Sequence, residues 1–318
     1  IKPTLLVYDA HPDYLSTRYA LERSASEGLP ALPVQHHHAH IASCLADNGD
    51  SGAEPVIGLA YDGTGFGDDN AIWGGEFLIA DYQGYERFGH LAYFPLPGGD
   101  LAIRQPWRSA LALLYSLEIP WEKDLAPVDY AQNLEEALPG LPVIKAFRGQ
   151  LDSRTNTPMT SSLGRLFDAA AALLGVRQEI SYEGQAAIEL EALVDPDEDR
   201  SYPVLLSQDR LFSPAALVTG MLKDIRNQLP VPQIAARFHN SLADMSLVVA
   251  QQIRADRGLT RVALSGGVWQ NISLLSRSYQ LLTKDGFEVL LHHNVPPNDG
   301  GLSLGQAVIG QRYLLSKE

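Results

Sequence analysis

The sequence predicts an α/β fold with two α/β lobes and a mainly helical region between and beside them. Strand-like apolar runs alternate with amphipathic helix patterns near both ends of the 318-residue chain, whereas helix patterns joined by proline-rich segments fill the middle. We therefore expect a first α/β lobe over residues 1–97, a helical region over residues 98–235 and a second α/β lobe over residues 236–318. Two α/β lobes around a cleft is the architecture that this order of elements favours.

The first lobe is expected to contain two strand–helix units followed by a β-hairpin. Both helix patterns end at a glycine, which is typical of a C-terminal cap. The run PVIGLAYD has no polar alternation and ends in an aspartate, as expected of a central strand buried on both faces. The predicted elements, in order, are the strand 4–9, the helix 14–28, the strand 31–34, the helix 36–49, and the hairpin strands 55–62 and 71–81 around the turn 62–70.

The later elements follow from the same patterns. In the middle region, apolar residues at helical spacing predict helices that include residues 109–118, 161–175 and 184–194. In the second lobe, two strand patterns are each followed by a loop and a helix. These are the strands 261–267 and 287–293, with helices over 268–282 and 301–315.

Bulk composition narrows the function classes. The formal net charge of −14 and the lack of a Lys/Arg cluster argue against a protein that tracks a phosphate backbone. No apolar stretch approaches the ~18–20 residues that a membrane span needs, so no membrane partner is expected. Cys44 is the only cysteine, which excludes an intramolecular disulfide and favours a reducing cytoplasm. Its apolar helical surroundings predict a buried structural thiol rather than a nucleophile.

The segment QHHHAHIAS carries the strongest chemical signal. On a helix, His36 and His40 are four residues apart and project from one face, where two imidazoles can chelate one divalent ion. His37 with His40 is the competing pair at a spacing of three. No glutamate follows His36, so the H-E-x-x-H pattern of zinc proteases is absent and protease chemistry loses its main support. The spacing leaves the choice between the two histidine pairs open.

Three glycine-bearing motifs follow predicted strands. In DGTG, Asp62 could bind a metal while Gly63, Thr64 and Gly65 approach phosphate, although a plain hairpin turn has the same composition. The pair Gly266–Gly267 precedes a helix and would allow a nucleotide to pass close to the backbone, but glycines are also common in ordinary turns. In NDGG, Asp299 is either a further metal ligand or the N-cap of the next helix.

A polar residue interrupts one apolar helix in the middle region. Asp168 must find a polar partner there, and the ribose hydroxyls of a nucleotide are one candidate. Glu183 and Gly184 lie near a helix terminus in the same region. Glycine motifs in both predicted lobes are what a nucleotide site between two lobes would require.

Seven motifs, in order, resemble a known family. The segments HPDYLSTRYA, VQHHHAHIAS, DGTGFGDDNAIWGGE, TSSLGRLFDAAAALLG, YEGQAAIELEAL, LSGGVWQN and VPPNDGGLSLGQA are similar to the C-terminal part of the HypF family, the carbamoyltransferases that mature nickel–iron hydrogenases. The resemblance runs over almost the whole chain. It implies a two-lobed, duplicated ribonuclease H-like fold of the actin/Hsp70/sugar-kinase type, in its TsaD-like branch.

The resemblance also implies two groups of site residues. It selects His36 and His40 over His37 and joins them to Asp62 and Asp299 as ligands of iron or zinc. The second group would contact ATP or carbamoyl-adenylate. Its members are Gly63, Thr64, Gly65, Gly164, Asp168, Gly184, Gly266, Gly267 and Asn271.

The activity implied by the resemblance is carbamoyl transfer from carbamoyl-adenylate to the C-terminal cysteine of HypE. Acylphosphatase and YrdC-like domains of the full-length family proteins would act upstream. The sequence shows the motifs of neither domain, and it has no counterpart of the Gly-rich hairpin that usually opens the TsaD-like domain. It implies the transfer half-reaction only, and no general base is identified, although His38 and His239 are candidates. The alternatives are a TobZ-type O-carbamoyltransferase, a TsaD-type enzyme acting on tRNA, and a non-enzymatic nucleotide-dependent scaffold.

Overall fold

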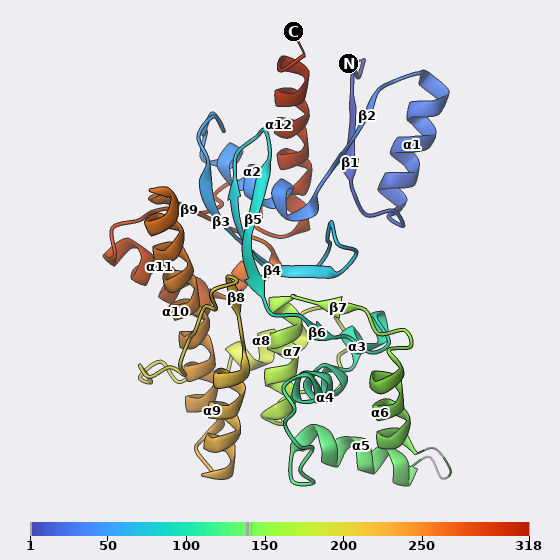
Figure 1. Cartoon of the computed structure of the whole chain (residues 1–318), viewed down its shortest axis with the longest axis vertical. Helices are drawn as coiled ribbons and strands as arrows, with labels where there is room; N and C mark the ends of the chain where they lie inside the picture. The colour runs from blue at the N-terminus through green and yellow to red at the C-terminus, as the bar shows by residue number, and fades with distance from the viewer. Residues whose placement is uncertain (1, 138–139, 141, 318) are drawn as a thin grey trace. The chain divides into compact units, whose positions relative to one another are not determined.

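The structure is a computed structural model that describes residues 2–137, 140 and 142–317 (Figure 1). The chain divides into two compact units. Unit 1 comprises Ile1–His90, Ser246–Gln270 and Tyr279–Glu318, and unit 2 comprises Leu91–Met245 and Asn271–Ser278. No helix among the described residues is both long and apolar enough to cross a membrane.

Unit 1 is an α/β structure. Its strands are β1 (Leu6–Asp9), β2 (Ala31–Val34), β3 (Val56–Phe66), β4 (Ile72–Ala80), β5 (Tyr85–Leu91), β9 (Arg261–Ser265) and β10 (Glu288–Leu290). Its helices are α1 (Leu15–Glu27), α2 (His36–Asp47) and α12 (Leu302–Leu315), with short 3₁₀ turns η1 (Gly267–Gln270) and η2 (Asp299–Gly301). These elements confirm the predicted α/β class and the strands and helices predicted for this part of the chain, except that the predicted helix 268–282 begins as η1 and is α-helical only from Ile272. As predicted, α1 ends at a glycine: Gly28 adopts a left-handed conformation with φ 68°.

The strands of unit 1 form a mixed sheet in the order β10-β9-β3-β4-β5. β3, β4 and β5 are antiparallel neighbours, whereas β9 and β10 run parallel to β3, with Ile57 opposite Val262. The sequence pattern places β9 and β10 in a separate lobe, but here they extend the sheet of β3. A local sequence pattern predicts each strand. Which strand it pairs with depends on packing between segments that, for β3 and β9, are about 200 residues apart. β1 and β2 form a separate parallel pair.

β3 runs past the residue where its apolar pattern stops. The pattern predicts a strand end at Asp62, but the strand continues to Phe66 as one side of the predicted hairpin with β4. The register shifts between Tyr61 and Gly65, so the intervening residues form a bulge in the pairing. A bulge redirects side chains locally, and bulges are common beside functional sites. The bulge contains Asp62.

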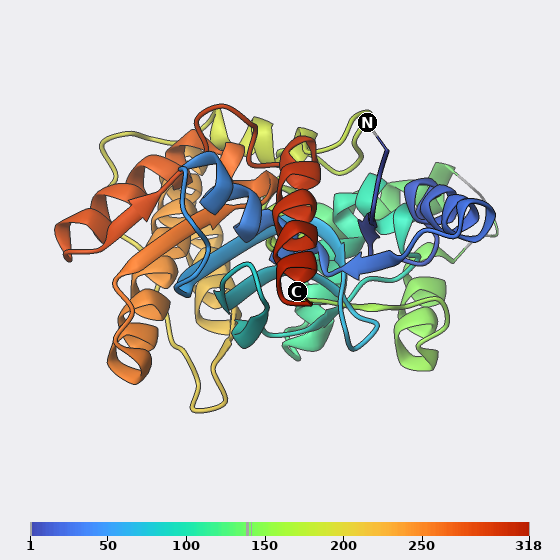
Figure 2. The same cartoon turned by 90° about the horizontal axis from the view of Figure 1, so that it is seen from above.

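Glycines allow two elements to approach α2 closely. Built onto Gly305 of α12, a Cβ atom would lie 1.9 Å from the carbonyl oxygen of Ala39, and built onto Gly58 of β3 it would lie 2.7 Å from Ile41. Helices α2 and α12 therefore lie side by side, as Figures 1 and 2 show. The ten residues from His36 to Leu45 are all buried as a result. The histidine-bearing helix is thus held on two sides, by contact of its backbone with α12 and of its Ile41 side chain with β3.

Unit 2 is mainly helical, as the sequence predicts for the middle region. Its helices are α3 (Asp100–Arg104), α4 (Pro106–Ser116), α5 (Ala126–Ala137), α6 (Val143–Ser153), α7 (Leu163–Leu173), α8 (Gln185–Glu191) and α9 (Ala215–Arg226). Its short strands are β6 (Phe94–Pro95), β7 (Met159–Thr160) and β8 (Leu211–Phe212). The helices α10 (Val231–Arg257) and α11 (Ile272–Lys284) contribute residues to both units. Within unit 2, α7 is buried along its whole length and packs against α4 and α8.

Candidate metal centre

The helix α2 starts at the histidines because Gln35 caps it. The Gln35 side chain accepts a hydrogen bond from the backbone N–H of His38, which satisfies a donor that the first turn leaves unpaired. The helix therefore begins at His36, and His36 and His40 share one face. Their ring centroids are 4.9 Å apart.

Four predicted metal ligands of unit 1 lie together. One ligand atom from each of His36, His40, Asp62 and Asp299 lies within 4.8 Å of the other three. From His36 Nε2, the distances are 3.2 Å to Asp62 Oδ2 and 3.6 Å to Asp299 Oδ1. From His40 Nε2, both corresponding distances are 3.6 Å. Three of the residues are buried and Asp299 is exposed, so the cluster is open to solvent on the side of Asp299.

The cluster concentrates charges that shift one another's pKa values. Burial alone would lower the pKa of His36, but the carboxylates of Asp299, Asp62 and Asp9 raise it well above the ordinary value. Burial alone would raise the pKa of Asp62, yet His36 and His40 hold it well below the ordinary range. The same histidines lower the pKa of Asp299. The carboxylates are therefore ionised, and a divalent cation would neutralise them.

These residues fit a metal ion by spacing and by chemistry. An ion bound at about 2.0–2.2 Å separates tetrahedral ligands by roughly 3.3–3.6 Å, close to the four distances between histidine and carboxylate atoms. Buried His40 Nε2 has no hydrogen-bond partner among the described residues, so this ring nitrogen has room to bind a cation. Two imidazoles and two carboxylates form a donor set that suits zinc or iron.

Asp299 is directed to the histidines because its neighbour caps the next turn. The Asn298 side chain accepts a hydrogen bond from the Gly300 N–H and is the N-cap of η2. The alternative that Asp299 itself serves as the cap is therefore wrong. Helix α2 also holds this segment directly, because the Ser43 hydroxyl donates to the Gly301 carbonyl at 2.7 Å.

The C-terminal end of α2 also binds the segment before Asp299, through Asp47. Its carboxylate accepts hydrogen bonds from the backbone N–H groups of His293 and Asn294 and from the Asn294 side chain. Burial alone would raise the pKa of Asp47, but these hydrogen bonds lower it to about 2. One helix thus supplies two ligands and anchors the segment that carries a third group, Asp299.

Asp47→Asn is expected to lower the free energy of unfolding by roughly 1–2 kcal/mol at neutral pH. A carboxyl group whose pKa falls on folding stabilises the fold above its unfolded pKa, and this stabilisation is lost as the pH falls through the folded pKa. The difference between the variant and the unchanged chain should therefore narrow below about pH 4. Urea denaturation over a pH series measures it, with Asp13→Asn at an exposed site as the control. A difference that stays constant down to about pH 3 would contradict the interpretation.

The glycines near Asp62 have defined neighbours in the structure. Gly267 donates its backbone N–H to Asp62 Oδ1 at 3.0 Å and so orients that carboxylate. Gly266 has φ 110°, and a Cβ there would lie 2.2 Å from the Tyr61 carbonyl oxygen. At Gly65 a Cβ would lie 2.3 Å from the ring of His37. Gly63 and Thr64 lie in the bulge of β3 beside Asp62. Close backbone packing thus accounts for Gly65 and Gly266.

The remaining nucleotide-site candidates lie in unit 2. Asp168 is buried on α7 and pairs with Arg165, their nearest charged atoms being 3.1 Å apart. Burial raises the pKa of Asp168 to about 6 against the lowering effect of Arg165. Gly164 lies in the first turn of α7, and Gly184, with φ 76°, is the N-cap residue of α8. Asn271 contacts His239 at 3.0 Å and caps α11 by accepting from the Leu274 N–H.

The two candidate bases have other partners. His239 is buried, its Nδ1 bonds to the Ala235 carbonyl, and burial lowers its pKa to about 4. His38 Nε2 lies 2.7 Å from the Asp81 carbonyl oxygen, and burial lowers the pKa of His38 as well. As predicted, Cys44 is fully buried, and burial raises its pKa to about 12. These geometries assign a base role to neither histidine.

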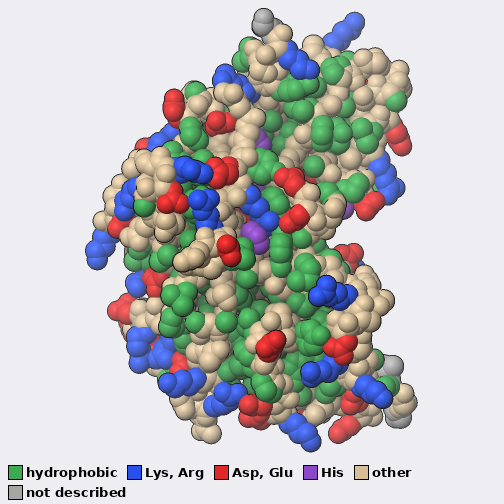
Figure 3. All heavy atoms as spheres, viewed as in Figure 1, with side chains coloured by type: hydrophobic (Ala, Val, Ile, Leu, Met, Phe, Trp, Pro, Cys, Tyr) green, Lys and Arg blue, Asp and Glu red, His purple; other side chains and the backbone are tan. Residues whose placement is uncertain are grey.

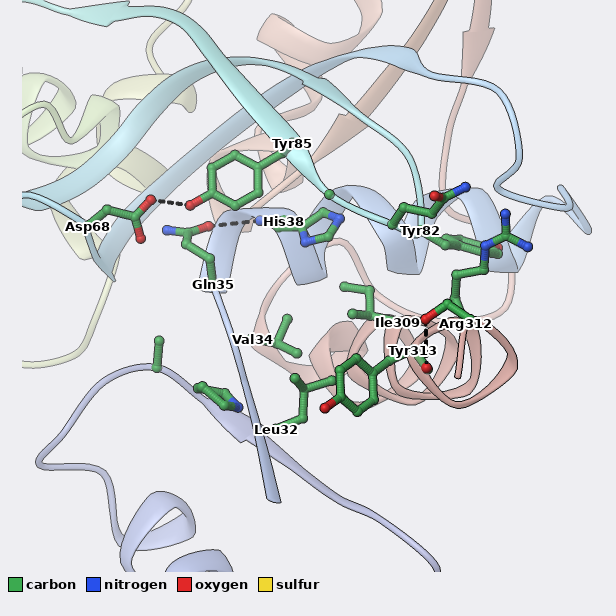
Figure 4. A pocket seen from close by; sticks show the side chains of 15 residues that line it. Leu32, Val34, Gln35, His38, Asp68, Tyr82, Tyr85, Ile309, Arg312 and Tyr313 are labelled. Atoms are coloured by element: carbon green, nitrogen blue, oxygen red, sulfur yellow. Dashed lines mark hydrogen bonds between the residues drawn. The ribbon is translucent and has the colours of Figure 1, made fainter. Parts of the chain in front are cut away.

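His38 instead faces a pocket of about 600 Å³ on unit 1 (Figure 4). The pocket is lined by β2, the start of α2, the β4–β5 turn and the end of α12. Figure 4 shows Tyr85 donating its hydroxyl to Asp68 and His38 beside Gln35. The four clustered ligands are not among the residues that line it, so the pocket is distinct from the candidate metal centre.

Two residues that lie beside the cluster were not predicted from the sequence. Asp9, at the end of β1, accepts from His36 Nδ1 at 2.8 Å. Tyr14 lies near enough for the charges of His36 and Asp9 to affect its pKa, which burial raises. Both belong to the strand and loop before α1, and their only local signal is a polar residue at a strand end.

Comparisons with known proteins place the chain in a family. A family described as "Carbamoyltransferase, Kae1-like Domain, second subdomain" matches residues 58–306, and one described as "HypF Kae1-like domain" matches residues 1–47. The carbamoyltransferase HypF2 of Cupriavidus necator is 38% identical over 96% of this chain and 39% of its own length. The "Carbamoyltransferase HypF homolog" of the same organism is 39% identical over 96% of this chain and 77% of its own length.

A solved structure is similar over nearly the whole chain. A crystal structure of full-length HypF in the phosphate- and nucleotide-bound form matches with a TM-score of 0.87 and 41% identity, covering 99% of this chain and 40% of that one. The chain thus spans about two fifths of the length of that protein and of HypF2. The family match extends over more than half of the chain. The chain therefore belongs to the HypF family of carbamoyltransferases and corresponds to its Kae1-like domain.

Proposed function

We propose that this chain transfers a carbamoyl group from carbamoyl-adenylate to the C-terminal cysteine thiol of HypE, a step in making the cyanide ligand of nickel–iron hydrogenases. The observation that carries the proposal is the cluster of two histidines and two aspartates in a chain of the HypF family. A full-length HypF relative is nucleotide- and phosphate-bound in its crystal, which supports a nucleotide ligand here. YrdC-like and acylphosphatase domains would supply the activated substrate in the cytoplasm.

The proposed fold is the two-lobed actin/Hsp70 type. In support, unit 1 contains three antiparallel strands followed by two parallel ones in a single sheet. The residues proposed to contact a nucleotide are Gly63, Thr64, Gly65, Gly266 and Gly267 of unit 1, and Gly164, Asp168, Gly184 and Asn271 of unit 2. The ion pair of Asp168 with Arg165 provides fixed polar groups for a ribose.

The proposed transfer step exchanges one bond for another at the carbamoyl carbon. The thiolate sulfur of HypE attacks the carbamoyl carbon, the bond from that carbon to the phosphate oxygen of AMP breaks, and AMP leaves with the electron pair. When bound, iron or zinc would supply a Lewis acid near the oxygen that gains charge. His36, His40 and Asp62 hold their side of the site from buried positions, and exposed Asp299 borders the side where the substrate would enter. No internal nucleophile is needed, in keeping with the burial of Cys44.

The acceptor surface is expected to suit a protein rather than a nucleic acid. Figure 3 shows acidic and basic side chains interspersed over the viewed face, without the continuous basic tract that a phosphate backbone requires. The formal net charge of −14 has the same implication. An acceptor cysteine is therefore favoured over tRNA.

The test supplies carbamoyl-adenylate, HypE and the metal-loaded chain, and detects carbamoylated cysteine by mass spectrometry. HypE without its C-terminal cysteine is the control. Modification of that cysteine is expected. Modification of tRNA or of a small-molecule hydroxyl would favour the TsaD-type or TobZ-type function instead. Complex formation without transfer of the group would leave a scaffold role and overturn the proposal.

A further inference from the structure

We propose that Asp9 is a positioning residue that fixes the ring orientation and the tautomer of His36 for metal binding. The inference rests on the metal centre of the proposed function. Asp9 Oδ2 lies 2.8 Å from His36 Nδ1, and the side chains of the two residues are 5% and 0% exposed. The opposite ring nitrogen, Nε2, faces Asp62 and Asp299. Asp9 and the candidate ligands thus contact opposite edges of one imidazole.

The contact with Asp9 decides which ring nitrogen of His36 can bind a metal ion. A neutral imidazole has one N–H donor and one acceptor nitrogen, and an ionised carboxylate can only accept. Asp9 therefore requires that Nδ1 keeps its proton, so when a metal ion displaces the proton on the other nitrogen, the lone pair of His36 is on Nε2, inside the cluster. A carboxylate that accepts from the outer nitrogen also makes the inner nitrogen a stronger donor to a cation.

The position of Asp9 is itself fixed by its surroundings. Its other carboxylate oxygen accepts from the His11 N–H at 2.8 Å, and its backbone carbonyl accepts from the Thr17 hydroxyl. β1 and β2 pair so that Asp9 lies opposite Val34, two residues before His36. The pairing of β1 with β2 thus carries the carboxylate to the first turn of α2. With two hydrogen bonds on its carboxylate, Asp9 has little freedom to turn away from the ring.

The role predicts a loss of metal affinity without loss of a ligand. Replacing the outer partner of a metal-bound histidine typically weakens metal binding by about 10- to 100-fold. We expect this range for Asp9→Asn, which keeps the shape of the side chain but removes its charge, and a loss at the upper end for Asp9→Ala. Asp13→Asn removes an exposed carboxylate from the same loop and should change affinity by less than about two-fold.

The experiment titrates the whole chain with zinc against a competing chromophoric chelator. The order of affinity should be unchanged chain and Asp13→Asn, then Asp9→Asn, then Asp9→Ala. In the zinc-loaded unchanged chain, NMR should show a strongly hydrogen-bonded Nδ1–H proton of His36, assigned with His36→Gln and shifted in Asp9→Asn. Thermal unfolding of each metal-free variant shows whether a loss of affinity reflects a loss of fold.

Three outcomes would overturn the inference. If Asp9→Asn is folded and binds zinc as tightly as the unchanged chain, the positioning role fails while the metal centre and the transfer reaction stand. If the His36 proton in the zinc-loaded unchanged chain is on Nε2, the tautomer is wrong, and this result needs no variant. If the unchanged chain binds no zinc or iron, the metal centre fails and the inference fails with it.

Discussion

The double substitution His36→Ala/His40→Ala is expected to abolish metal binding and carbamoyl transfer. Both imidazoles point their Nε2 atoms at the oxygens of Asp62 and Asp299, and three of these four side chains are buried. Without them, two aspartates remain, too few ligands to retain zinc or iron against water. Metal analysis should fall from about one ion per chain to about none. Transfer should fall by at least about 1,000-fold, or about 4 kcal/mol of transition-state stabilisation.

A neighbouring histidine provides the matched control. His38 lies on the same helix, is also buried and bonds to the Asp81 carbonyl, on the side of the pocket rather than of the cluster. His38→Ala should therefore keep its metal and its transfer activity while losing some stability. Full metal occupancy in the double variant would show that the ion binds elsewhere. Normal transfer by a metal-free double variant would show that the reaction needs no metal.

Local patterns in the sequence predicted the parts of the centre that local forces determine. The helix that carries His36 and His40 follows from its apolar helical pattern and the glycine after its end. The buried strand leading to Asp62 follows from its unbroken apolar run. The side of His40 that faces the cluster follows from the helical repeat, because residues four apart share a face. The choice of His36 over His37 came from the resemblance to HypF.

Features that depend on pairing between distant segments could not be predicted in the same way. Asp9 reaches His36 only because β1 pairs with β2. The sheet continues from β3 to β9 through contacts between residues about 200 positions apart. Glycines were ambiguous for another reason. A glycine is needed wherever a phosphate or another part of the protein approaches the backbone closely. The motif alone therefore could not show that Gly65 packs against His37 or that Gly267 donates to Asp62.

Gly305→Ala is expected to be among the most destabilising single substitutions in unit 1. The added Cβ would lie 1.9 Å from the Ala39 carbonyl oxygen and 2.9 Å from the Ser43 backbone nitrogen. Both atoms belong to the backbone of α2, so no side chain can rotate away and α12 must move instead. Overpacking a well-packed contact costs about 1–3 kcal/mol, and we expect the upper end of this range because backbone is on both sides. Urea denaturation of the metal-free chain measures the loss.

A second helical glycine, Gly149, provides the control for Gly305→Ala. At Gly149 on α6, apart from the adjoining backbone of the helix itself, no atom of the described chain lies within 4 Å of an added Cβ. Gly149→Ala should therefore raise stability by roughly 0.5–1 kcal/mol through helix propensity alone. Gly305→Ala should also weaken zinc binding, because α2 carries both histidines and α12 follows directly from the turn of Asp299. If Gly305→Ala is as stable as the unchanged chain, the close contact of the two helices does not exist in solution. If it is destabilised but binds zinc normally, the contact supports the fold without setting the positions of the ligands.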